Sequence, residues 1–496
     1  MRIQYKKSDF LGTYDSIVKY AERAIIQGDY LKGIQLIKCA ANYQYNLNIL
    51  LVDERLERLI KIISESKSKY SLGYEYIEGN VILYDSFAWD NRGLTQQYLD
   101  ALCSTGKYRI MLVHNTFFST NSANIVEFCK KNGVVMEELG NSTYTERENK
   151  LLKIINEFRP QHVLFHLFPF DVLPLITFGI FLKITKYQIN ITDHAFWLGA
   201  RSIDYSFEFR KRGASISHNQ RGIAKDHLLY LPYYPWQEPN KFEGFPNKTD
   251  GKIKVFAGGS LYKIEGGNSE FYKIVKKILE ENEDVVFLYA GGGDYTNIHS
   301  FIKINHFEER VILLGNRTDI NEVVSHIDIF INTYPMIGGL MSQLAAINRK
   351  PILTYKSKSV EDIVCIKRKE KLVFDTIDDL VDEANKLIKD SNYRKRRGDL
   401  MRSLLIDQGE FRTLFQEIFE TKKAIDSIED IKLEPYFYDA YLKRINNGTQ
   451  GLVIEEMIRE SCREALCWKM KINLYLPMIR HKIHLAKMKF LDFFLI

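Results

Sequence analysis

Several chemical signatures are missing from this chain of 496 residues. Its six cysteines form no Cys-x-x-Cys pair, so the sequence indicates neither a disulfide framework nor a thiolate zinc site. It contains no Asp-x-Asp, the carboxylate pair that usually holds a divalent ion on a nucleotide diphosphate, so we expect no metal and no other cofactor. No Gly-x-Gly-x-x-Gly follows the first strand expected in either half, which disfavours a dinucleotide dehydrogenase.

Export and membrane signals are also weak. No apolar stretch follows the basic residues near the N-terminus, so no secretory signal is visible, and the scattered cysteines fit a reducing cytoplasm. One apolar run, residues 164–184, has the length of a bilayer span, but Asp171 interrupts it between Pro169 and Pro174. We expect a buried strand ending near Phe168, then a loop and a core helix.

The composition is that of a globular protein. Hydrophobic residues make up 45% and charged residues 27%, which excludes disordered and collagen-like chains. The formal net charge of +6 is too small and too diluted to indicate a nucleic-acid partner. At about 150 residues per domain, the length predicts about three domain-sized units, or two large ones with extensions.

The N-terminal segment, residues 1–75, has the apolar spacing of helices. A break at Gly28 and Asp29 is typical of a helical hairpin. We interpret this segment as an extension that caps the next domain. The alternative is a repeat-like module that binds a partner protein, although one hairpin cannot form a solenoid.

Two stretches then alternate short apolar runs with helical segments, on either side of a Pro-, Gly- and Asn-rich linker at 236–252. The runs of the first domain (76–235) are 81–86, 108–115, 162–168, 188–193, 214–219 and 227–232. Those of the second domain (253–424) are 253–259, 285–293, 310–315, 327–333, 350–355 and 372–376. Such runs suit parallel strands buried on both faces. We therefore predict an α/β protein with two doubly wound, Rossmann-like domains that face a ligand-binding cleft.

The C-terminal segment, residues 425–496, is again helical in pattern. Residues 459–496 carry eight Lys and Arg against three acids, interleaved with Phe, Leu and Ile. This pattern is typical of a helix on an anionic membrane surface, so we expect a cytoplasmic protein that is peripheral on the inner face of the plasma membrane. A helix that packs on the first domain with a solvated basic face is the alternative, and both stay open.

Glycines occur where three expected strands of the second domain end. They are Gly258-Gly259, which precede Ser260, then Gly291-Gly292-Gly293 and Gly338-Gly339. Glycine lets backbone N–H groups approach a ligand, and a helix N-terminus adds free N–H groups. The three turns together predict a diphosphate site. Lys263 and, second, Arg317 are the cations placed to reach a phosphate, although a solvated loop lysine is the alternative for Lys263.

Acid–base candidates lie in the first domain, after the run 188–193. Asp193 and His194 are adjacent, and a carboxylate can orient a histidine as a base. Trp197 offers a flat face for a sugar ring. The alternative for His194 is a structural role at a strand end. His166 is expected to be a buried, satisfied core residue, and a place lining the cleft is the alternative.

Five segments resemble the GT-B glycosyltransferases. They are GGSLYKIEG (258–266), FLYAGGGD (287–294), residues 311–355, NRGLTQQYLDAL (91–102) and ITDHAFWLG (191–199). The resemblance covers about residues 80–420. It is closest to family 4 of the glycosyltransferase classification (group 1 type), with a likeness to the O-GlcNAc transferase type around the Gly-Gly turn.

The resemblance implies that the second domain holds a nucleotide-sugar donor. The implied donor contacts are Gly258, Gly259, Ser260, Lys263, Gly291, Gly292, Gly293, Asn316, Arg317, Gly338, Gly339 and Ser342. The implied acceptor-side positions are Asn91, Arg92, Gly93, His166 and His194. Family 4 enzymes usually carry two glutamates around the last helix start, but here the only acid between Glu322 and Glu361 is Asp328. Gln343 or Ser342 would have to replace the ribose-binding carboxylate.

We therefore expect a metal-independent glycosyltransferase, a hexosyltransferase of glycan or glycoconjugate biosynthesis that acts on a glycan, lipid-linked or protein hydroxyl. Asp193 and His194 would form the base if the reaction inverts configuration. One alternative is a non-catalytic GT-B partner that stabilises an active transferase, which the missing glutamates favour. Another is a nucleotide-sugar epimerase, which would normally need acids near the sugar.

Overall fold

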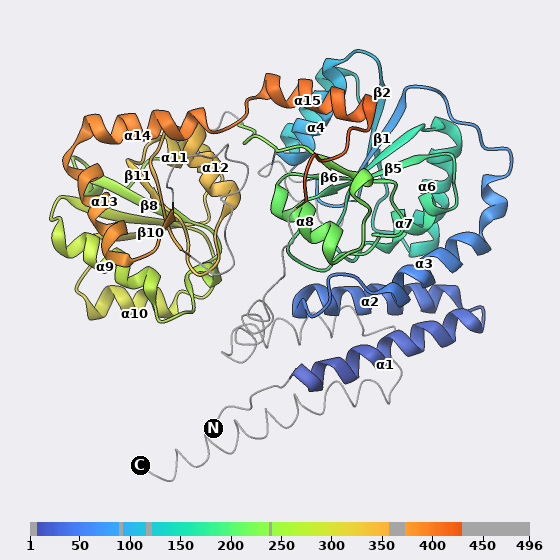
Figure 1. Cartoon of the computed structure of the whole chain (residues 1–496), viewed down its shortest axis with the longest axis horizontal. Coiled ribbons are helices and arrows are strands. Elements are labelled where there is room, and N and C mark those ends of the chain that lie inside the picture. Colours follow the sequence, from blue (N-terminus) through green and yellow to red (C-terminus); the bar gives the residue numbers. More distant parts are fainter. Residues whose placement is uncertain (1–6, 89–92, 116–121, 238–240, 357–372, 429–496) are drawn as a thin grey trace, which may run out of the picture. The chain divides into compact units, whose positions relative to one another are not determined.

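A computed structural model describes residues 7–88, 93–115, 122–237, 241–356 and 373–428 (Figure 1). The chain divides into two compact units. We call unit 1 the described residues within 1–89, 102–230 and 417–496, and unit 2 those within 90–101 and 231–416. Residues 429–496, which include the predicted basic helices, and residues 89–92 lie outside the described part of the chain.

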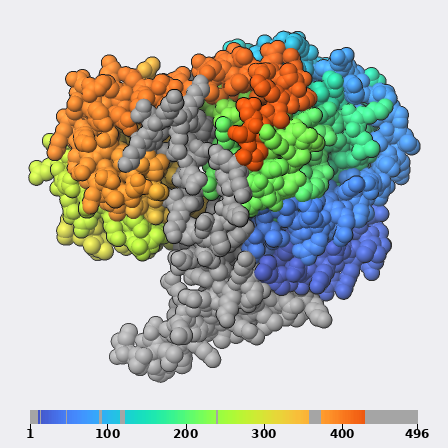
Figure 2. Space-filling view, in the orientation of Figure 1, coloured from blue at the N-terminus to red at the C-terminus, as the bar shows by residue number. Residues whose placement is uncertain are grey.

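Unit 1 begins with the expected helical hairpin, α1 (Lys7–Ile26) and α2 (Tyr30–Leu47), followed by α3 (Glu54–Ser66). Gly28 takes a φ of +79°, which favours glycine, and the Asp29 side chain caps α2 by accepting from the Lys32 N–H at 3.2 Å. The three helices share one apolar core with the sheet of unit 1. In the space-filling view the dark blue N-terminal residues form a continuous surface with the lighter blue residues that follow (Figure 2).

The sheet of unit 1 has seven parallel strands in the order β3-β2-β1-β4-β5-β6-β7. They are β1 (Asn80–Asp85), β2 (Arg109–His114), β3 (Val135–Glu138), β4 (His162–His166), β5 (Thr185–Asn190), β6 (Tyr205–Glu208) and β7 (Leu228–Tyr230). The chain connects them through α4 (Leu94–Ser104), α5 (Ala123–Asn132), α6 (Tyr144–Phe158), α7 (Val172–Gly179) and α8 (Lys211–Asn219). The strand order reverses between β1 and β4, so their carboxyl ends flank the point where ligands bind in doubly wound sheets.

One predicted strand of unit 1 is wrong. Residues 214–219 belong to α8, and β6 lies between β5 and β7 instead. Alternating Ser and apolar residues imitate a half-buried strand, but Ser215 and Ser217 are buried in the helix. The Ser217 hydroxyl accepts from Asn190 Nδ2 at 3.2 Å, which satisfies it inside the protein. Strands β3 and β6 were not predicted.

The apolar run 164–184 forms the expected buried strand, loop and core helix. It contains the end of β4, a loop with Asp171, and α7, which is buried along most of its length. Within the described residues, no helix has both the length and the apolar character needed to cross a bilayer.

The sheet of unit 2 has six parallel strands in the order β10-β9-β8-β11-β12-β13, and all six were predicted. They are β8 (Ile253–Gly258), β9 (Val285–Ala290), β10 (Val311–Gly315), β11 (Ile329–Ile331), β12 (Ile352–Tyr355) and β13 (Val373–Phe374). The helices are α9 (Glu270–Glu281), α10 (Thr296–Ile304), α11 (Ile320–Ser325), α12 (Gly339–Ile347), α13 (Ile377–Lys389), α14 (Ser391–Ser403) and the part of α15 (Gln408–Thr421) before residue 417, where unit 1 resumes. Two apolar clusters, one on each face, bury this sheet.

Helix α14 lies so close to the turn after α12 that a Cβ at Gly398 would overlap the carbonyl oxygen of Arg349. We predict that Gly398→Ala lowers the free energy of unfolding by about 1–3 kcal/mol, because two backbone segments would have to separate. Gly12→Ala, at an open position of α1, is the matched control and should be neutral or slightly stabilising. Chemical denaturation measures both variants, and equal stabilities would contradict the close packing.

Candidate functional site

The glycine turns of unit 2 meet at the carboxyl edge of its sheet, where β8 and β9 end side by side. The Gly259 N–H donates to the Ala290 carbonyl at 2.8 Å. A Cβ at Gly291 would overlap the carbonyl oxygen of Gly259, and φ is +137° at Gly259 and +148° at Gly291. Only glycine allows this approach of two main chains. The predicted convergence of the first two turns is therefore present.

The neighbouring strand extends the same edge. The Gly291 N–H donates to the Gly315 carbonyl at 2.8 Å, at the end of β10. Gly292 lies against the Asn316 amide, whose Oδ1 would be 2.9 Å from a Cβ at that glycine. Leu261 N–H donates to the Gly292 carbonyl at 2.9 Å. The loops after β8, β9 and β10 thus hold one another through main-chain contacts.

Lys263 lies over the first turn. It belongs to the one-turn helix η6 (Leu261–Ile264), and its half-buried side chain folds back so that Cδ and Nζ lie 3.4 and 3.9 Å from where a Cβ at Gly259 would stand. The Met336 N–H donates to the Lys263 carbonyl at 3.3 Å, which ties η6 to the segment that leads into α12. The ammonium group is thereby placed beside the glycine main chain.

The third turn begins α12. Gly338 N–H donates to Asn332 Oδ1 at 3.0 Å, and Asn332 Nδ2 donates to the Ser342 hydroxyl at 2.8 Å. The first N–H groups of α12 itself, from Gly339 onward, have no acceptor within the helix. Gly338 lies 3.8 Å, measured from an added Cβ, from the Gly258 carbonyl oxygen. The three glycine turns therefore share one edge.

The sequence predicted that Ser342 or Gln343 replaces a ribose-binding carboxylate, but the structure places both side chains elsewhere. Both are fully buried. The Ser342 hydroxyl also donates to the Gly338 carbonyl at 3.2 Å, and Gln343 Nε2 donates to the Tyr233 carbonyl at 3.3 Å. This placement supports the start of α12 and not a contact with a ribose.

Arg317 also corrects a prediction. Its guanidinium donates to both oxygens of Asp319 at 2.6 Å and to the Gly244 carbonyl at 3.0 Å, and its side chain is 9% exposed. This bidentate pair raises the pKa of Arg317 and lowers the pKa of Asp319. Arg317 therefore fastens the linker segment to β10 and is not a cation placed for phosphate.

In unit 1, Asp193 and His194 lie beyond the end of β5. His194 Nδ1 is 3.3 Å from Asp193 Oδ1, and the His194 side chain is 46% exposed while that of Asp193 is fully buried. Asp193 also accepts from Arg210 Nη2 at 2.6 Å and from Arg210 Nε. Burial disfavours the carboxylate, but Arg210 and His194 outweigh it and hold the pKa of Asp193 well below its usual range. Asp193 is thus a permanent anion that orients His194.

Trp197 does not offer the predicted sugar platform. Its side chain is buried, and the guanidinium of the fully buried Arg221 lies over its ring, 5.2 Å from the centroid. Arg221 Nη2 donates to the Ala195 carbonyl at 2.6 Å and to the Asp193 carbonyl at 2.8 Å. Trp197 and Arg221 therefore shape the loop that carries His194.

The N-terminal helices brace the same loop, residues 193–201. Asn48, at the end of α2, accepts from the Phe196 N–H at 2.9 Å and donates to the His194 carbonyl at 3.1 Å. Glu57 of α3 accepts from the N–H groups of Gly199 at 2.9 Å and Arg201 at 3.0 Å. Burial raises the pKa of Glu57 to about 7, against the opposing effect of these two backbone donors.

A buried acid–histidine pair lies where the strand order reverses, and only its histidine was predicted. Asp85 and His166 are register partners at the ends of β1 and β4, and His166 Nδ1 is 3.0 Å from Asp85 Oδ1. His166 is 2% exposed, as expected for a core residue. Nearby, the Ser86 hydroxyl donates to Asp171 Oδ2 at 2.6 Å. Asp85 is the last residue of the apolar strand β1, a signal that could have identified it, whereas Asp171 lies at the start of α7.

The predicted turn of the first domain is only partly described. Asn91 and Arg92 lie outside the described residues. Gly93 has a φ of +64°, and a Cβ there would overlap the Cβ of Trp236 within unit 2. Within the described ranges, no three His, Cys, Asp or Glu side chains form a group suited to a metal ion.

Comparisons with known proteins find a family model that matches part of this chain and solved structures that share its fold. Residues 252–390, which contain all three glycine turns, match the family model described as "Glycosyl transferases group 1". A search of the curated proteins found no match.

Solved structures share the fold at low identity. The Anabaena protein Alr3699/HepE, in complex with UDP and glucose, is 12% identical, with 69% of this chain and 99% of that chain covered at a TM-score of 0.50. A mutant of the Thermobaculum terrenum O-GlcNAc transferase is 13% identical, with 88% of this chain and 83% of that chain covered at a TM-score of 0.51. The GT-B fold expected from the sequence is confirmed.

The raised pKa of Glu57 predicts how the free energy of unfolding depends on pH. Its pKa rises from 4.5 to about 7 on folding, so between these values the folded protein binds a proton that the unfolded chain has lost. Raising the pH across this window should therefore lower the free energy of unfolding, by up to about 1.4 kcal/mol per pH unit. Denaturant titrations from pH 4.5 to 7 measure this slope.

Glu57→Gln should flatten that slope, whatever its effect on stability at a single pH. Glu65→Gln is the matched control, because the Glu65 side chain is an exposed carboxyl on the same helix (64% exposed) and is paired with Lys61, which is also exposed, so this variant should leave the slope unchanged. Identical slopes in the parent protein and Glu57→Gln would show that Glu57 does not titrate in this window.

Proposed function

We propose that this chain, a glycosyltransferase with the GT-B fold and a group 1 domain at residues 252–390, moves a sugar from a nucleotide diphosphate to an acceptor hydroxyl without a metal ion. The observation that carries the proposal is the meeting of three glycine turns and Lys263 at one sheet edge of unit 2. That edge adjoins β8 and β11, where the strand order reverses.

The chemistry of that edge suits a diphosphate leaving group. Main chain without Cβ atoms lets phosphate oxygens approach, and the open amides at the start of α12 carry partial positive charge. Lys263 adds a full positive charge beside Gly259. These groups are fixed before the reaction, so they would stabilise the negative charge that develops as the glycosidic bond to the diphosphate breaks. No Asp-x-Asp occurs in the sequence, which is why we propose this cation and these amides in the place of a metal.

The acceptor chemistry is assigned to unit 1. His194 is the exposed member of its pair, and the Asp193 anion would favour the tautomer with a proton on Nδ1. If the reaction inverts configuration, His194 Nε2 would accept the proton of the acceptor hydroxyl. If it retains configuration, His194 would position the acceptor. Asp193 then acts as a positioning residue, because Arg210 already binds its carboxylate.

The donor and the cellular site are further parts of the proposal. The similar Anabaena structure contains UDP and glucose, so a uridine diphosphate hexose is the first donor to test. The basic pattern of residues 459–496 supports contact with an anionic membrane surface, where a lipid-linked acceptor would be found.

Titration with UDP, followed by calorimetry, tests the nucleotide site directly. Saturable binding is expected, followed by UDP release from a donor when an acceptor is added. A non-catalytic partner subunit would bind no nucleotide, and an epimerase would convert the donor without any acceptor.

Lys263→Ala should lower turnover at least tenfold, which corresponds to about 1.4 kcal/mol of barrier, because a cation beside the leaving group is lost. Lys303→Ala on α10 is the matched control, since Lys303 is exposed in the same unit and its loss should leave turnover unchanged. Steady-state measurement of nucleotide release compares the two. Unchanged kinetics in Lys263→Ala would remove this lysine from the site.

A further inference from the structure

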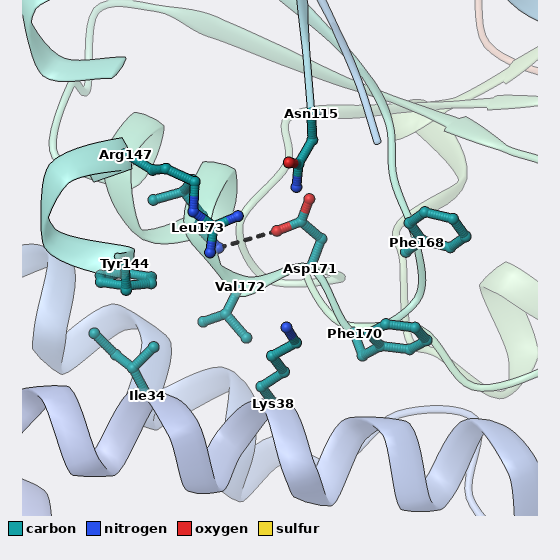
Figure 3. Close-up of a pocket in the computed structure, with 10 residues that line it drawn as sticks. All are labelled: Ile34, Lys38, Asn115, Tyr144, Arg147, Phe168, Phe170, Asp171, Val172 and Leu173. Atoms are coloured by element: carbon teal, nitrogen blue, oxygen red, sulfur yellow. Dashed lines mark hydrogen bonds between the residues drawn. The ribbon is translucent and has the colours of Figure 1, made fainter. Parts of the chain in front are cut away.

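Unit 1 contains a polar pocket that the glycosyl-transfer proposal does not use. It opens between α2, the start of α6 and the loop from β4 to α7, with a cavity volume of about 40 Å³ (Figure 3). A buried water needs about 10–15 Å³ on this measure, so the cavity has room for a few oxygen atoms and not for a whole sugar ring.

The pocket gathers three charged side chains: burial raises the pKa of Asp171, and both cations oppose that rise. Lys38 from α2 and Arg147 from α6 line it together with Asp171. Within the described ranges, neither cation forms an ion pair with an acid. The Asp171 carboxylate instead accepts from the Ser86 hydroxyl at 2.6 Å and the Leu173 N–H at 3.3 Å. Two cations facing one carboxylate leave an excess positive charge in the pocket.

Two buried polar atoms of the lining have no hydrogen-bond partner among the described residues. They are Arg147 Nε, a donor, and Asn115 Oδ1, an acceptor. Asn115 is 6% exposed, and Figure 3 shows its amide directed toward Asp171. Unsatisfied buried polar atoms are rare in folded proteins because each costs free energy. A ligand with both acceptor oxygens and hydroxyl donors would satisfy this pair.

The rest of the lining is aromatic. Phe168 and Phe170 stand on one side with ring planes 13° apart and centroids at 5.7 Å, and Tyr144 stands on the other (Figure 3). Flat aromatic faces pack against the C–H face of a sugar ring. The lining therefore combines a place for an oxyanion with surfaces for the ring that carries it.

We infer that this pocket binds the carboxylate or phosphate group of an anionic sugar between Lys38 and Arg147, while the ring stays outside the cavity, against Phe168 and Phe170. Binding follows from the pocket alone. The identification of that sugar as part of the acceptor rests on the proposed function. Because Lys38 comes from the N-terminal hairpin, this extension would contribute to acceptor choice.

Calorimetric titration of the full chain with glucuronate, inorganic phosphate and glucose tests the site. Glucuronate should bind at least tenfold more tightly than glucose, and competition by phosphate would indicate a phosphosugar as an equally suitable ligand. If phosphate does not compete with glucuronate, the site is restricted to carboxylates. Equal binding of glucuronate and glucose, or no binding of either, would overturn the proposal.

The variant pair Lys38→Met with Arg147→Gln should weaken glucuronate binding at least tenfold. Lys32→Met, an exposed lysine on the same helix, is the matched control and should change nothing. Lys38→Met alone is the second variant if the pair does not fold, and unchanged affinity there would contradict the proposal. UDP titration of the parent protein and of the same variants separates the two claims. If none of them binds UDP, the proposed function is refuted but the pocket is not.

Discussion

The carbonyl oxygen of Gly259 occupies the space that a side chain at position 291 would need, and the candidate site of unit 2 depends on this contact. Parallel strands deliver their loops to the same edge, where side chains would normally keep neighbouring loops apart. At the ends of β8 and β9 the side chains are absent, so the loops interlock through the Gly259, Gly291 and Gly315 main chains. An edge built in this way presents main chain instead of side chains, and the first amides of α12 and the Lys263 ammonium add positive charge to it. It is therefore polar and positive without many charged residues, which is what a diphosphate requires.

In unit 1, side chains and not main-chain contacts hold the loop of the candidate site. This loop, at 193–201, is fixed by buried and half-buried charged and amide side chains from outside the loop, namely Asn48, Glu57, Arg210 and Arg221. A buried charge is tolerated only when it is paired or well hydrogen-bonded, so each of these groups constrains the backbone it contacts. The N-terminal helices consequently belong to the architecture of the His194 loop. Their removal would leave the Gly199, Arg201 and Phe196 N–H groups without acceptors.

Much of the fold could be predicted because it follows from local patterns. Continuous apolar runs located all six strands of unit 2, and the break at Gly28 located the hairpin. The residues that were misjudged have partners that no pattern indicates, whether the partner is distant in the sequence, as Arg221 is from Trp197, or two residues away, as Asp319 is from Arg317. Trp197 was predicted to be an exposed platform, but the Arg221 guanidinium covers its ring. Arg317 was predicted to be a cation available for phosphate, but its guanidinium pairs with Asp319. Lys38, Asn115 and Arg147 gave no local signal, because what joins them is the packing of α2 and α6 against the sheet edge.

The two candidate sites differ in what they demand of the sequence. A site made of glycine turns constrains the backbone and few side chains, and residues 252–390, which the family model matches, contain all three turns. A site made of Lys38, Arg147, Asn115 and Asp171 depends on the chemistry of each side chain, and changing one of them changes what it binds. Under the proposed function, donor binding would be the general property of this fold. Acceptor choice would be the particular property of this chain, set where its N-terminal helices meet the first sheet.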